Sequence, residues 1–356
     1  MNEQYTRSLE KIEAVLDRWL PETPSQNWQT DVFSGNPGLS SYLTSALTSP
    51  GRDLLSRGGK RWRPLLMTLV CEASGGGDAA LPLAPLVEFS HNASLIHDDI
   101  EDNSDERRGK PAVHIIHGID TAINGGCFLY FLSAACIDSW AAGLEKNGLS
   151  PAEAANCKAK VYSLWAAYMR KLHLGQAVDI HWHKNVNVFP PLEEYFSMCA
   201  LKTGCLARFA ADLGAAAAES IPPLSLVPCP LSPLGEAAEK LGIGFQILDD
   251  VKNLTTGIPG KKRGDDIAEG KKSLPVLLFL QSRPEMAETV CRCFNAARSG
   301  GVGVPETEEL IKLLLDGGYL EEAENRGKAL IAEARNVFNG YGSEDSLLSG
   351  FADLLV

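Results

Sequence analysis

Residues 87–102 read VEFSHNASLIHDDIED, an apolar run that ends in a cluster of acidic side chains. On a helix, Asp98 and Asp102 stand at i and i+4, so both carboxylates project from one face. Carboxylates this close repel each other, and burying them without a partner is costly. Magnesium removes that conflict, because it takes one or two carboxylates together with substrate phosphates and water. The stretch therefore predicts a buried helix with a metal site at its end.

A lone acidic cluster would favour a solvated helix end over a metal site. The residues that flank this stretch favour the metal site. The cluster terminates an apolar helix, and Arg107 and Arg108 follow it directly. Guanidinium groups match the geometry of diphosphate oxygens. We therefore expect an anionic, metal-bound substrate at this point of the chain.

A second stretch repeats the design. Residues 244–253 read GFQILDDVKN, an apolar helix with paired aspartates, Asp249 and Asp250, and a polar group, Asn253, at i+4 from the first. Residues 260–275, rich in glycine and lysine, follow it. Such a segment suits a loop that covers phosphates. Two acidic motifs about 150 residues apart, each followed by basic residues, are hard to explain as two solvated helix faces.

The bulk composition is that of an ordinary globular protein, with 356 residues, 45% hydrophobic and 22% charged. The formal net charge of −12 argues against a nucleic-acid partner bound through a broad basic surface. The charged stretch Met1 to Leu20 lacks the features of a secretory signal. No run of about 18 uncharged apolar residues is present, so we expect no membrane span. The nine scattered cysteines fit reduced thiols, and the expected location is the cytoplasm.

Helical periodicity dominates the chain. Val161, Leu164, Trp165, Tyr168 and Leu172 recur at the spacing of one helix face. Strand-like alternation is nearly absent, so we expect an all-α fold of roughly a dozen helices around a central cleft. No linker separates two compositionally distinct halves, and a single domain is expected over residues 1–356. Its expected parts are an N-terminal helical extension (1–50), a motif-bearing core (55–280) and C-terminal helices (281–356).

Taken in order over roughly residues 55 to 280, the motifs resemble those of the trans-type polyprenyl (isoprenyl) diphosphate synthases. GGKRWRP at 58–64 is similar to the family's isopentenyl diphosphate site, and His91 precedes Asp98 by seven residues, as in the family. The other matches are Asp98 to Asp102 with Arg107 and Arg108; Gly175, Gln176 and Asp179; Lys202, Thr203 and Gly204; Gln246, Asp249 and Asp250; and Lys261 and Lys271. Each motif alone is weak, but their common order makes the identification strong.

The resemblance implies a helical bundle, homodimeric through helix packing, that joins isopentenyl diphosphate to an allylic diphosphate with three Mg²⁺ ions per site. It implies Asp98, Asp102, Asp249 and Asp250 as metal ligands. It implies Lys60, Arg63, His91 and Arg108 as contacts of isopentenyl diphosphate, and Arg107, Lys202, Lys261 and Lys271 as contacts of the allylic diphosphate. Thr203 and Gln246 would stabilise the allylic cation by their dipoles. The catalytic set would be Asp98, Asp102, Asp249, Lys202 and Arg107, because prepositioned positive charge stabilises the departing diphosphate.

Two positions depart from the family pattern. Asn253 stands where many members have aspartate, although similar versions occur in the geranylgeranyl-type eukaryotic enzymes. Its amide carbonyl can still ligate or accept a hydrogen bond. Cys127 replaces an aspartate that is common in the helix after the first motif, and the following Tyr130 and Phe131 again look like geranylgeranyl-type members.

The length of the product depends on what blocks the growing chain along the first acidic helix. Ala93 and Ser94, five and four positions before Asp98, are too small to form the floor. We expect that floor at Phe128 and Phe131 on the following helix. This favours geranylgeranyl diphosphate (C20), made from a dimethylallyl, geranyl or farnesyl primer. A product of C30 or longer stays an alternative, because Ala93 and Ser94 leave the path open.

Two other functions are compatible with parts of the sequence. A terpene cyclase would use similar acidic motifs, but it needs no isopentenyl site such as Lys60, Arg63 and His91. A non-catalytic partner subunit of a synthase would usually have lost the acidic motifs, and this chain keeps both.

Overall fold

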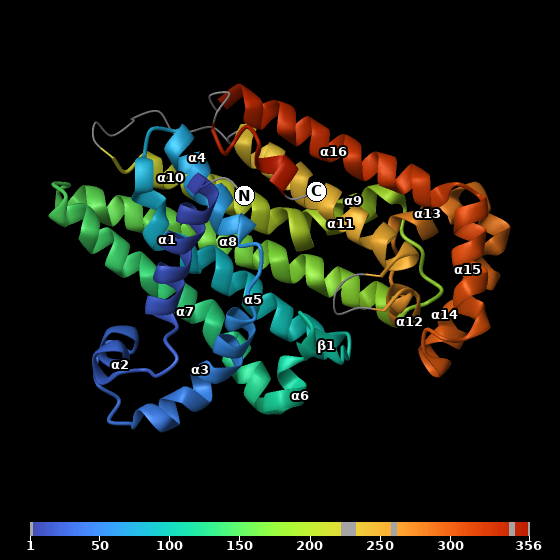
Figure 1. The fold of residues 1–356 in the computed structure, drawn as a ribbon, viewed down its shortest axis with the longest axis horizontal. Coiled ribbons are helices and arrows are strands. Elements are labelled where there is room, and N and C mark those ends of the chain that lie inside the picture. Colours follow the sequence, from blue (N-terminus) through green and yellow to red (C-terminus); the bar gives the residue numbers. More distant parts are fainter. Residues whose placement is uncertain (1–2, 222–232, 258–261, 342–345, 355–356) are drawn as a thin grey trace.

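The computed structural model describes residues 3–221, 233–257, 262–341 and 346–354, and these residues are almost entirely helical (Figure 1). The longer helices are α1 (Glu3–Trp19), α2 (Gln26–Val32), α3 (Ser41–Ser56), α4 (Trp62–Ala73), α5 (Ala84–Glu101), α6 (Val113–His117), α7 (Ile119–Lys146), α8 (Pro151–Lys184), α9 (Leu192–Cys199), α10 (Cys205–Ala218), α11 (Pro233–Thr255), α12 (Asp265–Glu269), α13 (Leu274–Ser282), α14 (Ala287–Gly300), α15 (Pro305–Asp316) and α16 (Tyr319–Tyr341). Short turns are η1 (Gly77–Leu83), η2 (Ala200–Gly204), η3 (Pro284–Met286) and η4 (Phe351–Leu354). The prediction of an all-α fold is confirmed.

The two helices that carry the acidic motifs, α5 and α11, lie inside the bundle. Helix α5 packs along α7, and α11 packs between α10 and α16 (Figure 1). Most of the α5 side chains from Ala84 to Ile96 are buried, as the apolar run at 87–96 predicts. Each motif therefore projects from the end of a helix that the core holds in place.

A short hairpin follows α5 and returns the two arginines to it. Helix α5 ends at Glu101, and Asn103 takes a left-handed conformation with φ 53°. The chain then forms β1 (Glu106–Arg107), which pairs antiparallel with β2 (Lys110–Pro111), the one sheet among the residues that the structure describes. The hairpin places Arg107 and Arg108 beside the acidic end of the helix.

The turn η2, between α9 and α10, carries Lys202 and Thr203 and has π-helical geometry. Helix α8 passes very close to it at Gly175. A Cβ atom on Gly175 would lie 2.5 Å from the backbone nitrogen of Lys202 and 2.6 Å from the carbonyl carbon of Leu201. Only glycine permits this approach, which brings α8 and Lys202 to the same place. Single π-turns inside helical segments are often found at functional sites.

The main hydrophobic core joins residues from Ile12 to Ala352. Near the C-terminal end, Phe351 packs against Trp62 on α4, with ring centroids 6.3 Å apart. Trp62 in turn stacks on Phe245 of α11 at 5.7 Å. The C-terminal helices thus support both α4 and α11. That the whole chain forms a single domain stays a prediction.

Helix α7 is the one helix, among the described residues, that is long and apolar enough to cross a membrane. Half of its most apolar window is buried inside the bundle, which is also true of an ordinary core helix. The eight cysteines among the residues that the structure describes are free thiols. This agrees with the expectation of reduced cysteines.

Candidate active site

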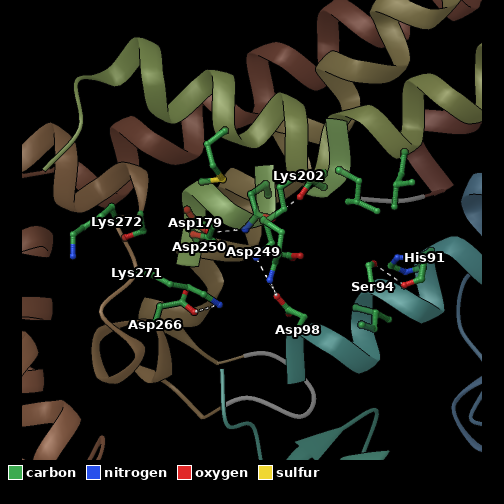
Figure 2. A pocket seen from close by; sticks show the side chains of 18 of the residues that line it. His91, Ser94, Asp98, Asp179, Lys202, Asp249, Asp250, Asp266, Lys271 and Lys272 are labelled. Atoms are coloured by element: carbon green, nitrogen blue, oxygen red, sulfur yellow. Dashed lines mark hydrogen bonds and ion pairs between the residues drawn. The ribbon is translucent and has the colours of Figure 1, made fainter. Parts of the chain in front are cut away.

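A cavity opens between the ends of α5 and α11, with η2, α8 and the segment that leads into α13 around it. The predicted site residues that line it are Arg63, His91, Ser94, Asp98, Arg107, Lys202, Thr203, Gln246, Asp249, Asp250 and Lys271. Figure 2 shows Asp98 on one wall, facing Lys202 and Asp249 on the other. The structure therefore brings together both acidic motifs and residues more than 170 positions apart in the chain.

Asp98 is surrounded by cationic and amide donors. Its Oδ1 accepts hydrogen bonds from Lys202 Nζ at 3.1 Å and from Gln176 Nε2 at 3.0 Å. Arg107 Nη2 lies 3.5 Å from Oδ2. Burial alone would raise the pKa of Asp98, but Lys202, Lys271 and Arg107 hold this pKa well below its ordinary value. Asp98 therefore carries its negative charge at neutral pH.

Asp99 and Asp102 have different environments although they flank the same helix end. Asp99 is fully buried and accepts hydrogen bonds from Arg107, one of them from Nε at 2.8 Å. Asp102 Oδ2 lies 3.3 Å from Lys271 Nζ. Asp98 therefore lines the cavity, Asp102 pairs with Lys271 at its edge, and Asp99 orients Arg107.

Lys202 is the cation at the centre of the cavity. It contacts Asp98 and also Asp179 on α8, at 2.5 Å. Burial would lower the pKa of Lys202, but Asp179 and Asp98 raise it above its usual value. The pKa of Lys271 is likewise raised by Asp102 and Glu269 against the effect of burial. Two buried, permanently charged ammonium groups therefore stand beside the acidic motifs.

The second acidic motif contributes Asp249 and Asp250 to the cavity. Asp250 accepts hydrogen bonds from Tyr195 Oη and from Gln246 Nε2, both at 2.9 Å. Burial and the nearby carboxylate of Asp266 raise the pKa of Asp250 to about 7. Burial also raises the pKa of Asp249. Two clustered, desolvated carboxyl groups of this kind favour the approach of a cation.

The donor set fits magnesium. Among the described residues, no three His, Cys, Asp or Glu side chains lie close enough together to hold a metal ion by themselves. Asp98 on one wall and Asp249 and Asp250 on the other provide hard oxygen ligands, and Asp102 lies behind Lys271, 3.3 Å from its Nζ. Magnesium in phosphate-binding sites takes one or two carboxylates and completes its shell with phosphate oxygens and water. A diphosphate between the walls would supply what the protein does not.

Asn253 does not face the cavity. Its Oδ1 accepts a hydrogen bond from the backbone nitrogen of Asp266 at 3.1 Å, and the side chain is almost fully buried. Of the two roles expected for the Asn253 carbonyl, ligand or hydrogen-bond acceptor, the structure shows the hydrogen-bond acceptor. Asn253 holds the start of α12, which carries Asp266 towards Asp250.

A second group of basic residues lies next to the acidic walls. Arg63 stacks over Trp62 with its guanidinium carbon 4.3 Å from a ring centroid, and Nη1 lies 3.2 Å from His91 Nε2. Burial lowers the pKa of Arg63 to about 10. Burial and the adjacent Arg63 and Arg108 hold the pKa of His91 well below its usual value, so His91 is neutral. Arg63 Nε is buried without a hydrogen-bond partner, as a donor reserved for a ligand would be.

The remaining members of the predicted phosphate-binding set are placed as follows. Arg108 lies behind the cavity wall, where its Nη1 donates to Leu54 O at 3.1 Å. Lys60 is exposed at the mouth, and its charge reaches Asp249, whose pKa it lowers in part. Lys261 lies outside the described residues. Thr203 Oγ1 donates to Gln246 Oε1 at 2.8 Å, so these two predicted dipoles are joined.

The residues predicted to set product length are only partly at the cavity. Ser94 lines it, whereas Ala93 is fully buried in the core. Phe128 stacks on Phe33, the residue that follows α2, with centroids 6.0 Å apart. Phe131 is 69% exposed, so it cannot be the floor of a pocket within this chain. The prediction for Phe131 is therefore corrected.

Tyr130, next to Phe131 in the chain, faces α5, where we expected the ring of Phe131. Its ring stacks on His97 of α5 at 5.8 Å and meets His173 of α8 at 5.2 Å. These three rings lie between α5, α7 and α8 at the level of His97, one turn closer to the acidic end of α5 than Ser94. Burial raises the pKa of Tyr130 above its usual value, which reflects an apolar surrounding.

Three α8 residues belong to the site although the sequence analysis assigned them no role. Gln176 and Asp179 contact Asp98 and Lys202, as described above. His183 Nε2 lies 2.7 Å from Asp179 Oδ1, and its Nδ1 lies 3.6 Å from Asp102 Oδ1. Burial would lower the pKa of His183, but Asp179 and Asp102 raise it. The Gly-Gln-x-x-Asp match pointed to α8, whereas nothing in the sequence indicated His183.

The fold and the paired acidic walls define a class of all-α proteins that bind diphosphates between two helix ends. The sequence pattern of the polyprenyl synthetase family matches residues 44–306, and the chain belongs to that family. A geranylgeranyl diphosphate synthase of Methanosarcina mazei is 30% identical over 97% of this chain and 94% of its own length. A geranylfarnesyl diphosphate synthase of Aeropyrum pernix is 29% identical over 89% of this chain and 94% of its own. The crystal structure of a geranylgeranyl pyrophosphate synthetase from Pyrococcus horikoshii superposes with a TM-score of 0.77 at 27% identity, covering 99% and 97% of the two chains.

Proposed function

We propose that this protein is a magnesium-dependent prenyltransferase that condenses isopentenyl diphosphate with an allylic diphosphate to give geranylgeranyl diphosphate. One observation carries the proposal. Two acidic helix ends face each other across a cavity, with the buried cations Lys202 and Lys271 between them and the Arg63–His91 pair beside them. Membership of the polyprenyl synthetase family supports the same reaction.

The allylic diphosphate would lie between the acidic walls. Its carbon–oxygen bond breaks, and negative charge grows on the departing pyrophosphate. Lys202, Lys271 and Arg107 are already charged and fixed by their carboxylate partners, so they stabilise this charge without reorganising. Magnesium held by Asp98, Asp102 and Asp249 would neutralise the same oxygens.

Isopentenyl diphosphate would bind at Arg63 and His91, with the charges of Arg108 and Lys60 close by. Its double bond then attacks the allylic carbon, a carbon–carbon bond forms, and one proton is lost. The proton would pass to the departing pyrophosphate, because cleavage of the carbon–oxygen bond leaves that group with a basic oxygen. The Thr203–Gln246 pair directs polar oxygens at the cavity, where they can stabilise the cation by their dipoles.

A C20 product is supported by the similarity to relatives named geranylgeranyl synthases. Ser94 lines the cavity and is too small to block it. The rings of His97, Tyr130 and His173 pack together beside the acidic end of α5 and limit the width of the space between α5, α7 and α8. A product of C30 or longer stays the alternative.

A homodimer is the proposed assembly, and the cytoplasm the proposed location. The outer face of α6 and α7 exposes an apolar stripe on the isolated chain, made of Ile115, Ile116, Ile119, Ile123 and Phe131. Exposed apolar patches of this kind mark protein–protein contacts. The free thiols of the described cysteines suit a reducing compartment.

The alternative functions fit the site less well. A terpene cyclase has no use for Arg63 and His91, which form a paired, buried anion site here. A non-catalytic partner subunit would not need Asp98 and Asp249 to face each other across a cavity that also holds Lys202.

A product assay tests the proposal. Purified protein, magnesium and labelled isopentenyl diphosphate are incubated with dimethylallyl, geranyl or farnesyl diphosphate, and the dephosphorylated products are sized by chromatography. We expect a discrete C20 product and no activity when magnesium is left out. For Asp98→Ala we expect a decrease in kcat of at least about 100-fold. Glu145→Gln, which removes an exposed carboxylate on α7, is the control and should keep full activity. Absence of elongation with every primer would refute the enzymatic proposal.

A further inference from the structure

The loop that carries Lys60 is flanked by two arginines, Arg57 and Arg61, whose side chains turn into the protein. Arg61 is only 4% exposed and has a left-handed backbone with φ 45°. Residues with a Cβ atom are disfavoured in this conformation, so the surrounding contacts must stabilise it. The conformation turns the chain from the end of α3 into α4 and leaves Lys60 at the mouth of the cavity.

Arg61 makes four hydrogen bonds that hold this turn. Its Nη1 donates to Glu88 of α5 at 2.8 Å and to Gly58 O at 3.3 Å. Its Nη2 donates to Leu55 O at 2.6 Å, and its Nε donates to Glu13 of α1 at 2.7 Å. Burial would lower the pKa of Arg61, but Glu88 and Glu13 raise it above its usual value. A single guanidinium thus joins α1, α3 and α5.

The hydrogen-bond network around Arg61 extends to Arg108. Asn92 Nδ2 donates to the Glu88 carboxylate at 2.9 Å, and Asn92 Oδ1 lies 3.5 Å from Arg108 Nη1. Arg108 Nη1 also donates to Gly58 O, the carbonyl that Arg61 contacts. Arg57 Nη1 donates to Arg107 O at 2.9 Å and so ties the loop to the hairpin. Loop and hairpin are therefore positioned by one network.

Helix α1 closes this network from outside. It packs on α4 and α5, and Ile12 and Leu16 are fully buried (Figure 1). Glu13 binds Arg61 on one side of the loop, and Asp17 binds Arg52 of α3 at 2.5 Å on the other. The side chains of these two ion pairs, Glu13–Arg61 and Asp17–Arg52, do not line the cavity.

We propose that α1, acting through Glu13 and Arg61, positions the diphosphate-binding loop and hairpin that carry Lys60 and Arg108. Glu13 and Arg61 are positioning residues, because they act through Lys60 and Arg108 and do not contact the substrate. The inference rests on the proposed function in that Lys60 and Arg108 bind the diphosphate of isopentenyl diphosphate. It predicts that the N-terminal helix governs the affinity for that substrate and leaves the allylic side unaffected.

Glu13→Ala is the informative variant, because the Glu13 side chain is 41% exposed and water can replace it. Glu10→Ala removes a carboxylate from an exposed position of the same helix and serves as the control. The experiment measures KM for each substrate, kcat, the melting temperature, and the dissociation constant of isopentenyl diphosphate by calorimetry without an allylic substrate. For Glu13→Ala we expect KM and the dissociation constant of isopentenyl diphosphate to rise roughly three- to fivefold. The allylic KM and kcat should stay within about 1.5-fold of the wild type, and Glu10→Ala should change nothing.

A second variant shows whether the effect passes through Arg61. Arg61→Lys keeps the charge but cannot bridge two carboxylates, so it should weaken isopentenyl diphosphate binding, and Glu13→Ala should add little in that background. Unchanged binding in Glu13→Ala would overturn the inference, as would equal changes in both KM values and kcat. Turnover by the wild type tests the proposed function separately, because the calorimetric comparison of isopentenyl diphosphate binding does not require turnover.

Discussion

Neighbouring residues of an α-helix point about 100° apart, and this separates Tyr130 from Phe131. From the sequence we expected the floor at Phe128 and Phe131, but the sequence could not indicate whether Tyr130 or Phe131 faces α5. The structure turns Tyr130 towards His97 and His173 and leaves Phe131 exposed. Only the packing of α7 against α5 and α8 decides the direction.

The first prediction concerns this pair. Tyr130→Ala removes the central of the three rings that fill the space between α5, α7 and α8 beside Asp98, so we expect products longer than C20 to appear alongside or in place of the C20 product. Phe131→Ala is the matched control, since it removes an exposed aromatic ring one residue away and should leave the length unchanged. Chromatography of the dephosphorylated products measures both. Longer products from Phe131→Ala but not from Tyr130→Ala would restore the original interpretation.

Other residues show the same limit of sequence reasoning. Asp98, Asp102, Lys202 and Lys271 could be predicted because helical spacing and motif order both point to them. Asn253 could not be placed, because its partner is a backbone nitrogen of the next helix. The roles of Gln176 and His183 depend on how α8 crosses the ends of α5, which no local pattern encodes.

At the scale of elements, the approach of α8 to η2 keeps Lys202 in the cavity. Helix types and several helix faces were predictable from periodicity. The π-helical geometry of η2 was not, because it follows from the tertiary packing around Gly175 and Gly204. The close approach of the α8 and η2 backbones thus fixes the position of Lys202.

The second prediction tests this closeness. Gly175→Ala places a methyl group 2.5 Å from the backbone nitrogen of Lys202, so η2 must move. We expect a loss of roughly 1–3 kcal/mol in the free energy of unfolding and a decrease in kcat. Gly143→Ala is the control, because its Cβ would meet nothing within 4 Å. That change should be neutral or stabilise α7 by up to about 1 kcal/mol, as measured by denaturant unfolding. A Gly175→Ala protein with normal stability and turnover would contradict the account.

At the scale of the whole molecule, fold class and helix content followed from composition and periodicity, since a chain with so little strand-like alternation has few other ways to bury its apolar residues. Which helices surround the cavity did not. That arrangement depends on contacts between segments far apart in the chain, such as the packing of α16 along α11.

The third prediction concerns assembly. If the stripe on α6 and α7 is the interface between two copies, Ile123→Glu should shift the protein from dimer to monomer, because it would bury unpaired charge. Leu315→Glu changes an equally apolar residue, 61% exposed on α15, and should leave the dimer intact. Light scattering coupled to size-exclusion chromatography measures the mass of each. A wild-type monomer, or a dimer that survives Ile123→Glu, would reject this surface.

The stack of Phe351 on Trp62, and of Trp62 on Phe245, has a consequence for how the protein is made. Translation delivers Trp62 of α4 early and Phe245 of α11 much later, and Phe351, which completes the stack on Trp62, is synthesised last of the three. Until Phe351 has left the ribosome, the helices that present Arg63 and Asp249 lack part of their support. A ribosome-bound nascent chain would therefore hold every motif of the catalytic centre without yet holding the centre itself.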